Sequence, residues 1–374
     1  MRRRMAKKWR FAAAHYWTKK PEGVTLTVSP SAGPSMRTPA RAAPTLLADL
    51  GGTNVRFALA DTGRANPLMD DSVRRYRVKD HDSLAEAMRQ YFKDTGLTAS
   101  RAIIAAAGRV SEGETVKVTN NPWQVAAHAL QAELGMEAVH LVNDFAAQAM
   151  AVPLHTHDQL SSVGAQPIPA LGTRESQTFV VVGPGTGLGV AGLMRREGRW
   201  MVLETEGGHA GFAAHTTEDV EILHRLNERF GRVSNERMIC GNGLVNLYLA
   251  LADIAGQPPE EYTPEDITAR AEAGSDPLCV RTVETLAGIF GSVAGDLVLN
   301  LGGWDGVYLT GGMLPILLPW LKHGGFRERF EAKGRFRETM EQVPTVAMMH
   351  PDPGLLGAAA LAVLDAGKAL LPNG

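Results

Sequence analysis

Residues that could bind a phosphate group lie near the start of the apolar segment 46–60. This segment carries Asp49, and four small or polar residues follow at once: Gly51, Gly52, Thr53 and Asn54. A carboxylate in a buried strand is costly unless it is paired, hydrogen-bonded or close to a metal ion. Glycines allow backbone N–H groups to approach an anion closely. The segment therefore indicates either a phosphate-binding hairpin whose acid meets a cation, or an ordinary Gly-Gly turn beside a satisfied aspartate.

A second acidic residue, Asp144, follows Asn143 where an expected strand over 138–142 meets an expected helix over 145–152. A carboxylate at a helix start can be a simple N-cap that the helix dipole stabilises. It could instead be a general base that accepts a proton from a substrate hydroxyl. The residues alone leave both interpretations open.

Acidic residues and a histidine occur together further along the chain. Glu206 and His209 flank two glycines, and Glu236 lies in Ser-Asn-Glu-Arg. Carboxylate and imidazole groups on a tight loop can hydrogen-bond the hydroxyls of a polyol. A zinc site is not expected, because no third ligand lies nearby. Glu236 could equally be a surface acid at a helix start.

Two more glycine-rich segments offer backbone donors. Residues 183–189 read Gly-Pro-Gly-Thr-Gly-Leu-Gly, and Gly311 and Gly312 follow an expected strand that starts at residue 306. The first segment lacks the Gly-Lys-Ser/Thr ending of a P-loop. It also does not lead directly into a helix, as a dinucleotide-binding fingerprint does.

The order of the expected elements indicates a duplicated α/β fold. A strand, a glycine-rich turn and a second strand occur at 46–59 and again at 179–193, and helices follow each time. This layout places ligand loops at the ends of strands. Further strands are expected at 72–78, 102–107, 199–204 and 344–349. Helices are expected at 82–94, 123–134, 217–230, 241–256, 264–273, 277–300 and 354–366. The segment 155–177 is expected to be a loop or domain junction, with His155 and His157 in solvent.

Composition is that of an ordinary globular protein, with 374 residues, 44% hydrophobic and 21% charged. The net charge is −2, but residues 1–41 hold ten Lys/Arg and one acid, so the remainder is acidic. That balance argues against a nucleic-acid binder. Two cysteines are too few for a disulfide framework and fit a cytoplasmic protein. No apolar run is expected to span a membrane. Residues 1–44 are expected to be a disordered or spurious extension, since translation could begin at Met36.

Taken together, these motifs closely resemble the bacterial glucokinase family of the sugar kinase/actin-like ATPase superfamily. The resemblance covers residues 45–362 and rests on an ordered set of matches. They are Leu-Ala-Asp-Leu-Gly-Gly-Thr-Asn-Val-Arg, Val-Thr-Asn-Asn-Pro-Trp, Val-Asn-Asp-Phe-Ala-Ala, Gly-Pro-Gly-Thr-Gly-Leu-Gly, Glu-Gly-Gly-His-Ala-Gly, Ser-Asn-Glu-Arg, Gly-Asn-Gly-Leu-Val-Asn and His-Pro-Asp-Pro-Gly-Leu-Leu-Gly-Ala. Cys240 departs from the serine that relatives often have, and Gly108-Arg109 replaces a segment where many have a nearby proline.

The resemblance implies an α/β protein with a two-lobed actin-like ATPase (ribonuclease H-like) fold, a duplicated sheet-and-helix core and a cleft between the lobes. The small domain would comprise residues 45–153 and 352–366, and the large domain residues 154–351. It implies a cytoplasmic enzyme that phosphorylates the C6 hydroxyl of glucose with ATP and Mg²⁺, and a possible homodimer. No nucleic-acid or membrane partner is implied.

The resemblance also implies roles for individual residues. Asp144 would be the catalytic base, for which no unusual pKa shift is required at pH 7, and Asp49 would position Mg²⁺ through water. The implied glucose-binding residues are Asn143, Asp144, Glu206, His209, Glu236 and either Asn120 or Asn121, with Asn121 preferred. The implied nucleotide-binding residues are Ala48, Asp49, Leu50, Gly51, Gly52, Thr53, Asn54, Gly185, Thr186, Gly187, Gly311 and Gly312.

Three alternative functions are compatible with parts of this pattern. A kinase for another hexose would differ only in its hydroxyl contacts. A non-catalytic, sugar-responsive regulator would need a DNA-reading element, and no helix-turn-helix pattern is evident. An actin-like or chaperone ATPase would keep the phosphate loops but would not need the Glu/His/Glu set.

Overall fold

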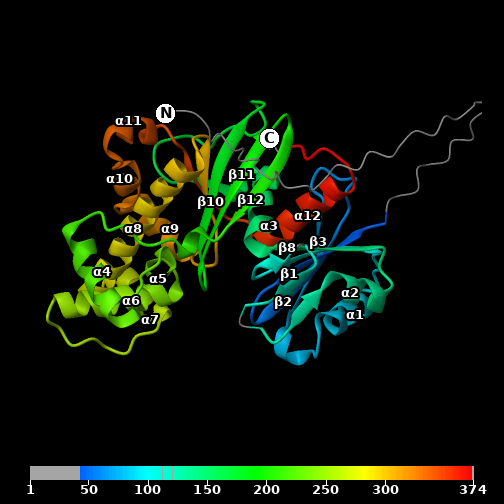
Figure 1. The fold of residues 1–374 in the computed structure, drawn as a ribbon, viewed down its shortest axis with the longest axis horizontal. Coiled ribbons are helices and arrows are strands. Elements are labelled where there is room, and N and C mark those ends of the chain that lie inside the picture. The colour runs from blue at the N-terminus through cyan, green and yellow to red at the C-terminus, as the bar shows by residue number, and fades with distance from the viewer. Residues whose placement is uncertain (1–42, 112, 120, 373–374) are drawn as a thin grey trace, which may run out of the picture. The chain divides into compact units, whose positions relative to one another are not determined.

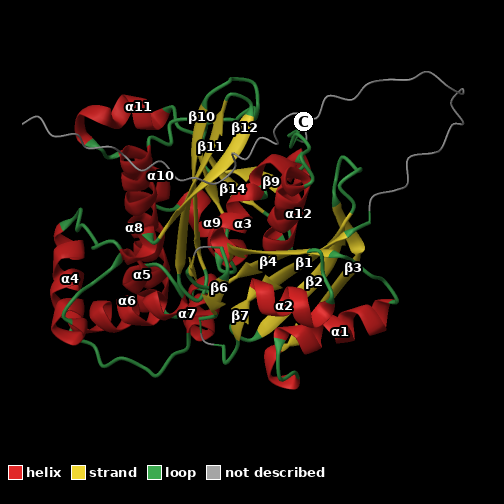
Figure 2. Ribbon diagram, turned by 45° about the vertical axis from the view of Figure 1, so that its right-hand side comes forward, coloured by secondary structure: helices red, strands yellow, loops and turns green. Residues whose placement is uncertain are grey.

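The computed structural model describes residues 43–111, 113–119 and 121–372. Contacts divide the chain into two units, Met1–Arg41 and Ala42–Gly374. The architecture below concerns the second unit, which Figures 1 and 2 show as ribbons. Of the extension expected over residues 1–44, residues 1–42 lie outside the described residues, and so does the candidate Asn120.

The first sheet has five strands in the order β3-β2-β1-β4-β8. Their bounds are β1 Thr45–Leu50, β2 Asn54–Ala60, β3 Leu68–Arg77, β4 Arg101–Ala106 and β8 Ala138–Asn143. Strand β1 is antiparallel to β2 and parallel to β4, and β4 is parallel to β8. The parallel neighbours put the ends of β1 and β8, and therefore Leu50 and Asn143, at the same edge of the sheet.

The second sheet repeats this plan. Its order is β12-β11-β10-β13-β14-β9. The bounds are β9 Leu160–Ser162, β10 Gln177–Pro184, β11 Leu188–Arg196, β12 Arg199–Thr205, β13 Gly306–Leu309 and β14 Thr345–Met348. Strand β10 is antiparallel to β11 and parallel to β13, as β1 is to β2 and β4. Every residue of β10 is buried, as expected for a strand covered by helices on both faces.

Helices cover the faces of both sheets. They are α1 Leu84–Thr95, α2 Ala127–Leu134, α3 Asp144–Met150, α4 Thr217–Phe230, α5 Asn235–Met238, α6 Gly241–Ile254, α7 Pro264–Glu272, α8 Pro277–Leu301, α9 Leu314–His323, α10 Phe326–Glu331, α11 Arg337–Glu341 and α12 Pro353–Asp365. Helices α1 and α2 share a hydrophobic cluster with the first sheet, whereas α6 and α8 share one with the second. A small sheet of β5 Val110–Ser111, β6 Thr115–Lys117 and β7 Gln124–Ala126 lies beside the first.

Helices α3 and α12 pack between the two sheets (Figure 1). One hydrophobic cluster contains residues of both helices together with Ala58 of β2 and Leu193 of β11. The two helices approach so closely that a Cβ atom at Gly357 would lie 1.6 Å from the carbonyl oxygen of Ala147. Glycine is therefore required at this crossing.

The chain passes between the two sheets twice, and the two connections are in contact. The first runs from α3 through the 3₁₀ turns Val152–Leu154 and His157–Gln159 into β9, and the second runs from β14 to α12. The Met349 N–H donates to the Gln159 carbonyl at 2.8 Å. The rings of His155 and His350 meet edge to face, with centroids 6.0 Å apart.

The structure confirms the strand–turn–strand duplication and most expected elements, but several local expectations were wrong. The helix expected over 123–134 begins only at Ala127, because β7 takes its first residues. The expected loop over 155–177 contains β9, and His155 is buried rather than solvated. Burial lowers the pKa of His155 to about 4.

The expectation that no apolar run reaches membrane-spanning length was also wrong. Helix α8 has 25 residues and a window of mean hydropathy 1.4, which is sufficient by length and composition. However, 78% of that window is buried inside the fold. Its length therefore reflects a core helix that is mostly buried.

Candidate active site

Asp144 is the first residue of α3, and Asn143 is the N-cap. The Asn143 side-chain oxygen accepts hydrogen bonds from the N–H groups of Phe145 at 2.9 Å and Ala146 at 3.0 Å. Its amide nitrogen donates to the Gly108 carbonyl at 3.1 Å. The capping role that the sequence left open therefore belongs to Asn143. The Asp144 carboxylate accepts the Phe145 N–H at 2.9 Å, and within the described residues no side chain donates to it, which leaves lone pairs for a further proton or hydroxyl.

The Asp144 carboxyl is desolvated and close to other acids. Burial is the main reason that its pKa is raised to about 6, and the charges of Asp49 and Glu206 act in the same direction. The hydrogen bond from Phe145 opposes this shift. No shift of the pKa is required for ionisation at pH 7, but the fold produces one. The sequence could not reveal the shift, because it arises from three segments that only the fold brings together.

The turn at Gly51–Asn54 is closed by its own backbone and held by Asn121. The Gly51 N–H donates to the Asn54 carbonyl at 3.0 Å. The Asn121 side-chain amide donates to the Gly51 carbonyl at 3.0 Å, and its oxygen accepts the Trp123 N–H at 2.8 Å. Asn121, expected as a sugar contact, thus lies directly against the candidate phosphate hairpin.

Asp49 is paired with an arginine that the sequence interpretation did not single out. Arg56 lies directly opposite Asp49 in the β1–β2 register and donates to its Oδ2 atom at 2.8 Å. Burial raises the pKa of Asp49, whereas the charge and hydrogen bond of Arg56 lower it. The carboxylate that looked costly in the sequence is therefore compensated by its cross-strand neighbour.

The three candidate sugar contacts of the second sheet form one cluster. The His209 ring lies 3.9 Å from a Glu236 oxygen and 4.0 Å from a Glu206 oxygen. Glu236 is not a free surface acid, because its Oε2 atom accepts the Leu188 N–H at 3.0 Å. A Cβ atom at Gly187 would lie 2.4 Å from that same oxygen, so the glycine allows the loop and the carboxylate to meet.

The two glycine-rich segments of the second sheet are pressed together. A Cβ atom at Gly183 would lie 2.3 Å from the Thr310 carbonyl oxygen, and one at Gly311 would lie 2.3 Å from the Pro184 oxygen. Gly311 has a φ of 96°, which favours glycine. The Gly185 carbonyl accepts the Gly241 N–H at 3.0 Å. The candidate phosphate loop and the candidate adenosine turn are thus one continuous backbone surface.

Helix α3 connects these groups. Phe145 packs against Gly189 of β11 so closely that a Cβ atom there would lie 2.0 Å from its ring. The Thr310 hydroxyl donates to the Gln148 side-chain oxygen at 3.0 Å. Asp144 therefore starts a helix that contacts both glycine-rich segments of the second sheet. By contrast, no hydrogen bond or ion pair joins the described segments 51–54 and 185–187.

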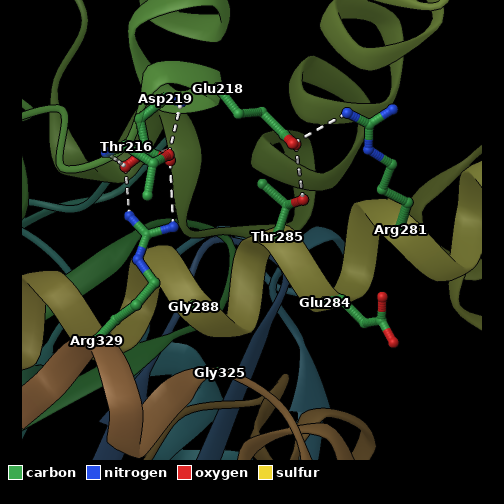
Figure 3. Close-up of a pocket in the computed structure, with 9 residues that line it drawn as sticks. All are labelled: Thr216, Glu218, Asp219, Arg281, Glu284, Thr285, Gly288, Gly325 and Arg329. Carbon is green, nitrogen blue, oxygen red and sulfur yellow. Dashed lines mark hydrogen bonds and ion pairs between the residues drawn. The ribbon is translucent and has the colours of Figure 1, made fainter.

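A separate pocket of about 380 Å³ contains none of the candidate site residues. It lies between α4, α8 and α10 (Figure 3). Its charged groups mostly neutralise one another, since Arg329 pairs with Asp219 and Arg281 pairs with Glu218 at 3.0 Å. Figure 3 shows Glu284 at its edge without such a pair. These pairings leave few charged groups of the pocket available for a ligand.

Comparison with known proteins identifies the family. The family model "Glucokinase" matches residues 46–364. The chain is 51% identical over 319 residues to a glucokinase of Stenotrophomonas maltophilia, which covers 85% of this chain and 95% of that protein. It is also 51% identical over 327 residues to a glucokinase of Xanthomonas campestris, covering 87% and 97%.

Solved structures agree with this assignment. A glucokinase from an Antarctic psychrotroph has a TM-score of 0.76 and 33% identity, covering 85% of this chain and 98% of that one. A glucokinase from Streptomyces griseus, described with glucose and AMPPNP, shares the fold with a TM-score of 0.57 and 19% identity, covering 85% and 98%. The duplicated sheets are thus those of the actin-like ATPase fold, as expected. From its motifs, its fold and these matches, we conclude that the chain belongs to the glucokinase family.

Proposed function

We propose that this protein transfers the γ-phosphoryl group of ATP to the C6 hydroxyl of glucose, giving glucose 6-phosphate and ADP. The observation that carries the proposal is the position of Asp144. Its carboxylate starts a buried helix, has lone pairs to spare, and feels the charges of Asp49 and Glu206. Asp49 belongs to the candidate phosphate-binding hairpin, and Glu206 belongs to the candidate sugar-binding cluster.

Asp144 would act as the general base. With a pKa of about 6 it is mostly ionised at pH 7. It can therefore accept the proton of the C6 hydroxyl while the oxygen attacks the γ-phosphorus. Asn143 would fix the direction of the carboxylate by holding the first turn of α3. Positioning is the main protein contribution expected in phosphoryl transfer.

The sugar would lie between the His209 cluster and the Asn121 side. Glu206, His209 and Glu236 offer acceptors and a ring nitrogen that can read several hydroxyls. Asn121 and Asn143 each use one amide donor internally, which leaves a second N–H for the substrate. A site built from such groups rejects a sugar whose missing hydroxyl leaves one of them unpaired.

The nucleotide would be held by backbone groups. Residues 48–54 and 185–187 would hold its phosphates, and Gly311 and Gly312 would lie beside the adenosine. Asp49 fits a magnesium role, because its second oxygen accepts no hydrogen bond from the described residues. When bound, Mg²⁺ would neutralise charge on the phosphate oxygens, with Asp49 acting through water.

Several broader properties belong to the same proposal. Residues 45–153 with 352–366, and residues 154–351, would form two domains that enclose the substrates. The protein would work in the cytoplasm, where its two buried thiols, Cys240 and Cys279, would stay reduced. A homodimer is proposed from the family resemblance, and mass measurement in solution tests it.

The central test replaces Asp144 with asparagine. We expect Asp144→Asn to lower kcat by about 10²–10⁴-fold, while the KM for glucose changes much less. A coupled assay for glucose 6-phosphate measures both constants. Near-normal turnover would remove the base assignment.

Thermal unfolding provides the control for this variant. A carboxyl whose folded pKa is raised stabilises the fold below its unfolded pKa and loses that contribution as pH rises through about 6. At pH 7 the ionised Asp144 therefore destabilises the fold by at most about 3 kcal/mol. Asp144→Asn should match or exceed the wild-type Tm at pH 7, so a lost turnover cannot be attributed to unfolding.

A hexose panel tests the closest alternative. Glucose, mannose, fructose and N-acetylglucosamine are supplied with ATP, and kcat/KM is compared. A preference for another sugar would retain the kinase chemistry but replace the substrate. ATP turnover that no sugar stimulates would instead favour an ATPase or a sensor.

A further inference from the structure

Arg56 lies between two carboxylates that are far apart in the sequence. It donates from Nη1 to Asp49 of β1 at 2.8 Å. Its Nε atom lies 3.3 Å from Oδ1 of Asp352, the N-cap residue of α12. Arg75, its neighbour on β3, lies 4.0 Å from the same Asp352 oxygen. Two positive and two negative groups thus connect three strands of the first sheet to the start of α12.

The Arg56 guanidinium uses two of its edges in this arrangement. The contact with Asp49 is a hydrogen bond. The contact between Nε and the Asp352 oxygen is an ion pair without hydrogen-bond alignment. Both of these atoms are buried and have no hydrogen-bond partner among the described residues. A lysine has a single charged centre and cannot reach two carboxylates in this way. The arginine thus faces both carboxylates at once, with a hydrogen bond to Asp49 and an ion-pair contact to Asp352.

The carboxylate of Asp49 is fixed from a second direction. A Cβ atom at Gly354, in the first turn of α12, would lie 2.7 Å from the Asp49 carboxyl carbon. The glycine lets the helix pack directly on the acid. Arg56 donates to Oδ2, whereas Oδ1 accepts no hydrogen bond from the described residues and can therefore face an outside group.

We propose that Arg56 is a positioning residue for the magnesium–nucleotide complex. It binds one carboxylate oxygen of Asp49, so that the other oxygen can face the cation. Through Asp352 it also connects the phosphate hairpin to α12. This inference rests on the proposed function, because it assigns Arg56 to the nucleotide side of that site. It also predicts that the sugar side does not depend on Arg56.

The test compares Arg56→Gln, Arg56→Lys and Asp352→Asn with an exposed control, Arg199→Gln, on β12. Calorimetry measures the binding of MgAMPPNP and of glucose separately, and the coupled assay gives the Mg²⁺ concentration for half-maximal rate. We expect Arg56→Gln to weaken MgAMPPNP binding and to raise the Mg²⁺ requirement at least about tenfold. Glucose binding should change less than about twofold, because the cluster at His209 is untouched.

The other variants separate positioning from folding. Arg56→Lys should restore part of the MgAMPPNP affinity, since it keeps the charge but not the fork. Asp352→Asn should give an intermediate loss, and the control should match the wild type. Equal loss of MgAMPPNP and glucose binding in Arg56→Gln, or an unchanged Mg²⁺ requirement, would overturn the proposal. If the wild type binds MgAMPPNP but phosphorylates no sugar, the proposed function fails. The role of Arg56 is then still tested by the MgAMPPNP affinities of the variants.

Discussion

The surroundings of Asp144 destabilise its ionised carboxylate and thereby make it a stronger base. Desolvation and the nearby acids Asp49 and Glu206 raise its pKa to about 6. Because this pKa lies below 7, the carboxyl group is mostly ionised at neutral pH. Because it lies above that of an exposed aspartate, the carboxylate is also the stronger base. The structural cost of burying it is thus linked to its reactivity.

The raised pKa predicts an acid limb in the pH profile of the free enzyme. The proposed base must be ionised to accept a proton, so we expect kcat/KM for glucose to fall below pH 6, by about tenfold per pH unit. Steady-state rates between pH 5 and pH 8 measure this limb. A limb centred near pH 4 would show that the carboxyl is solvated like an ordinary aspartate.

Some of the candidate site residues could be predicted from the sequence, and others could not. Asp49, Asp144 and Glu236 could be selected as candidates because they lie beside glycines or at expected helix starts, within an ordered set of motifs that resembles one family. Arg56 could not, since an arginine on a strand next to a turn is commonplace. Its role depends on the β1–β2 register and on Asp352, about 300 residues away. Cross-strand register alone could have suggested the first contact.

At the scale of elements, α3 and α12 determine whether the site is assembled. Helix α3 carries Asp144 and packs on β11, while α12 closes on Asp49. Their mutual contact at Gly357 and Ala147 therefore joins the two acids through a pair of helices. The sequence predicted both helices, but the contact between them could not be predicted from either one.

Replacement of Gly357 by alanine tests this contact. A Cβ atom there would lie 1.6 Å from the Ala147 oxygen. We therefore expect Gly357→Ala to destabilise the fold by roughly 1–3 kcal/mol or more and to lower kcat, since α3 must shift. The matched control is Gly325→Ala, where the nearest atom would lie 3.9 Å away. Thermal unfolding that leaves both variants equally stable would contradict this packing argument.

Most elements that the sequence did not predict are short or irregular, although the ten-residue helix α9 is also among them. Strand β9 has three residues, and α5, α10 and α11 have four to six. Such segments are too short for a hydrophobic period to be visible, and tertiary contacts stabilise them instead. Strand β9, for example, exists because it pairs with β14.

At the scale of the whole molecule, the family match begins at residue 46, one residue after the start of β1. We therefore expect the kinase activity to belong to the unit Ala42–Gly374. A chain that starts at Met36 should keep kcat/KM for glucose within about twofold of the full chain. The coupled assay on both chains measures this. A large loss of activity would assign the preceding residues a role in catalysis or folding.

The two connections between the sheets have a mechanical consequence. The Met349–Gln159 hydrogen bond and the His155–His350 contact place both covalent links at one point. Bodies whose covalent connections lie at one point can rotate about that point more easily than they can slide apart in parallel. Any domain movement that accompanies catalysis in this protein should therefore be a rotation whose pivot passes close to His155 and His350.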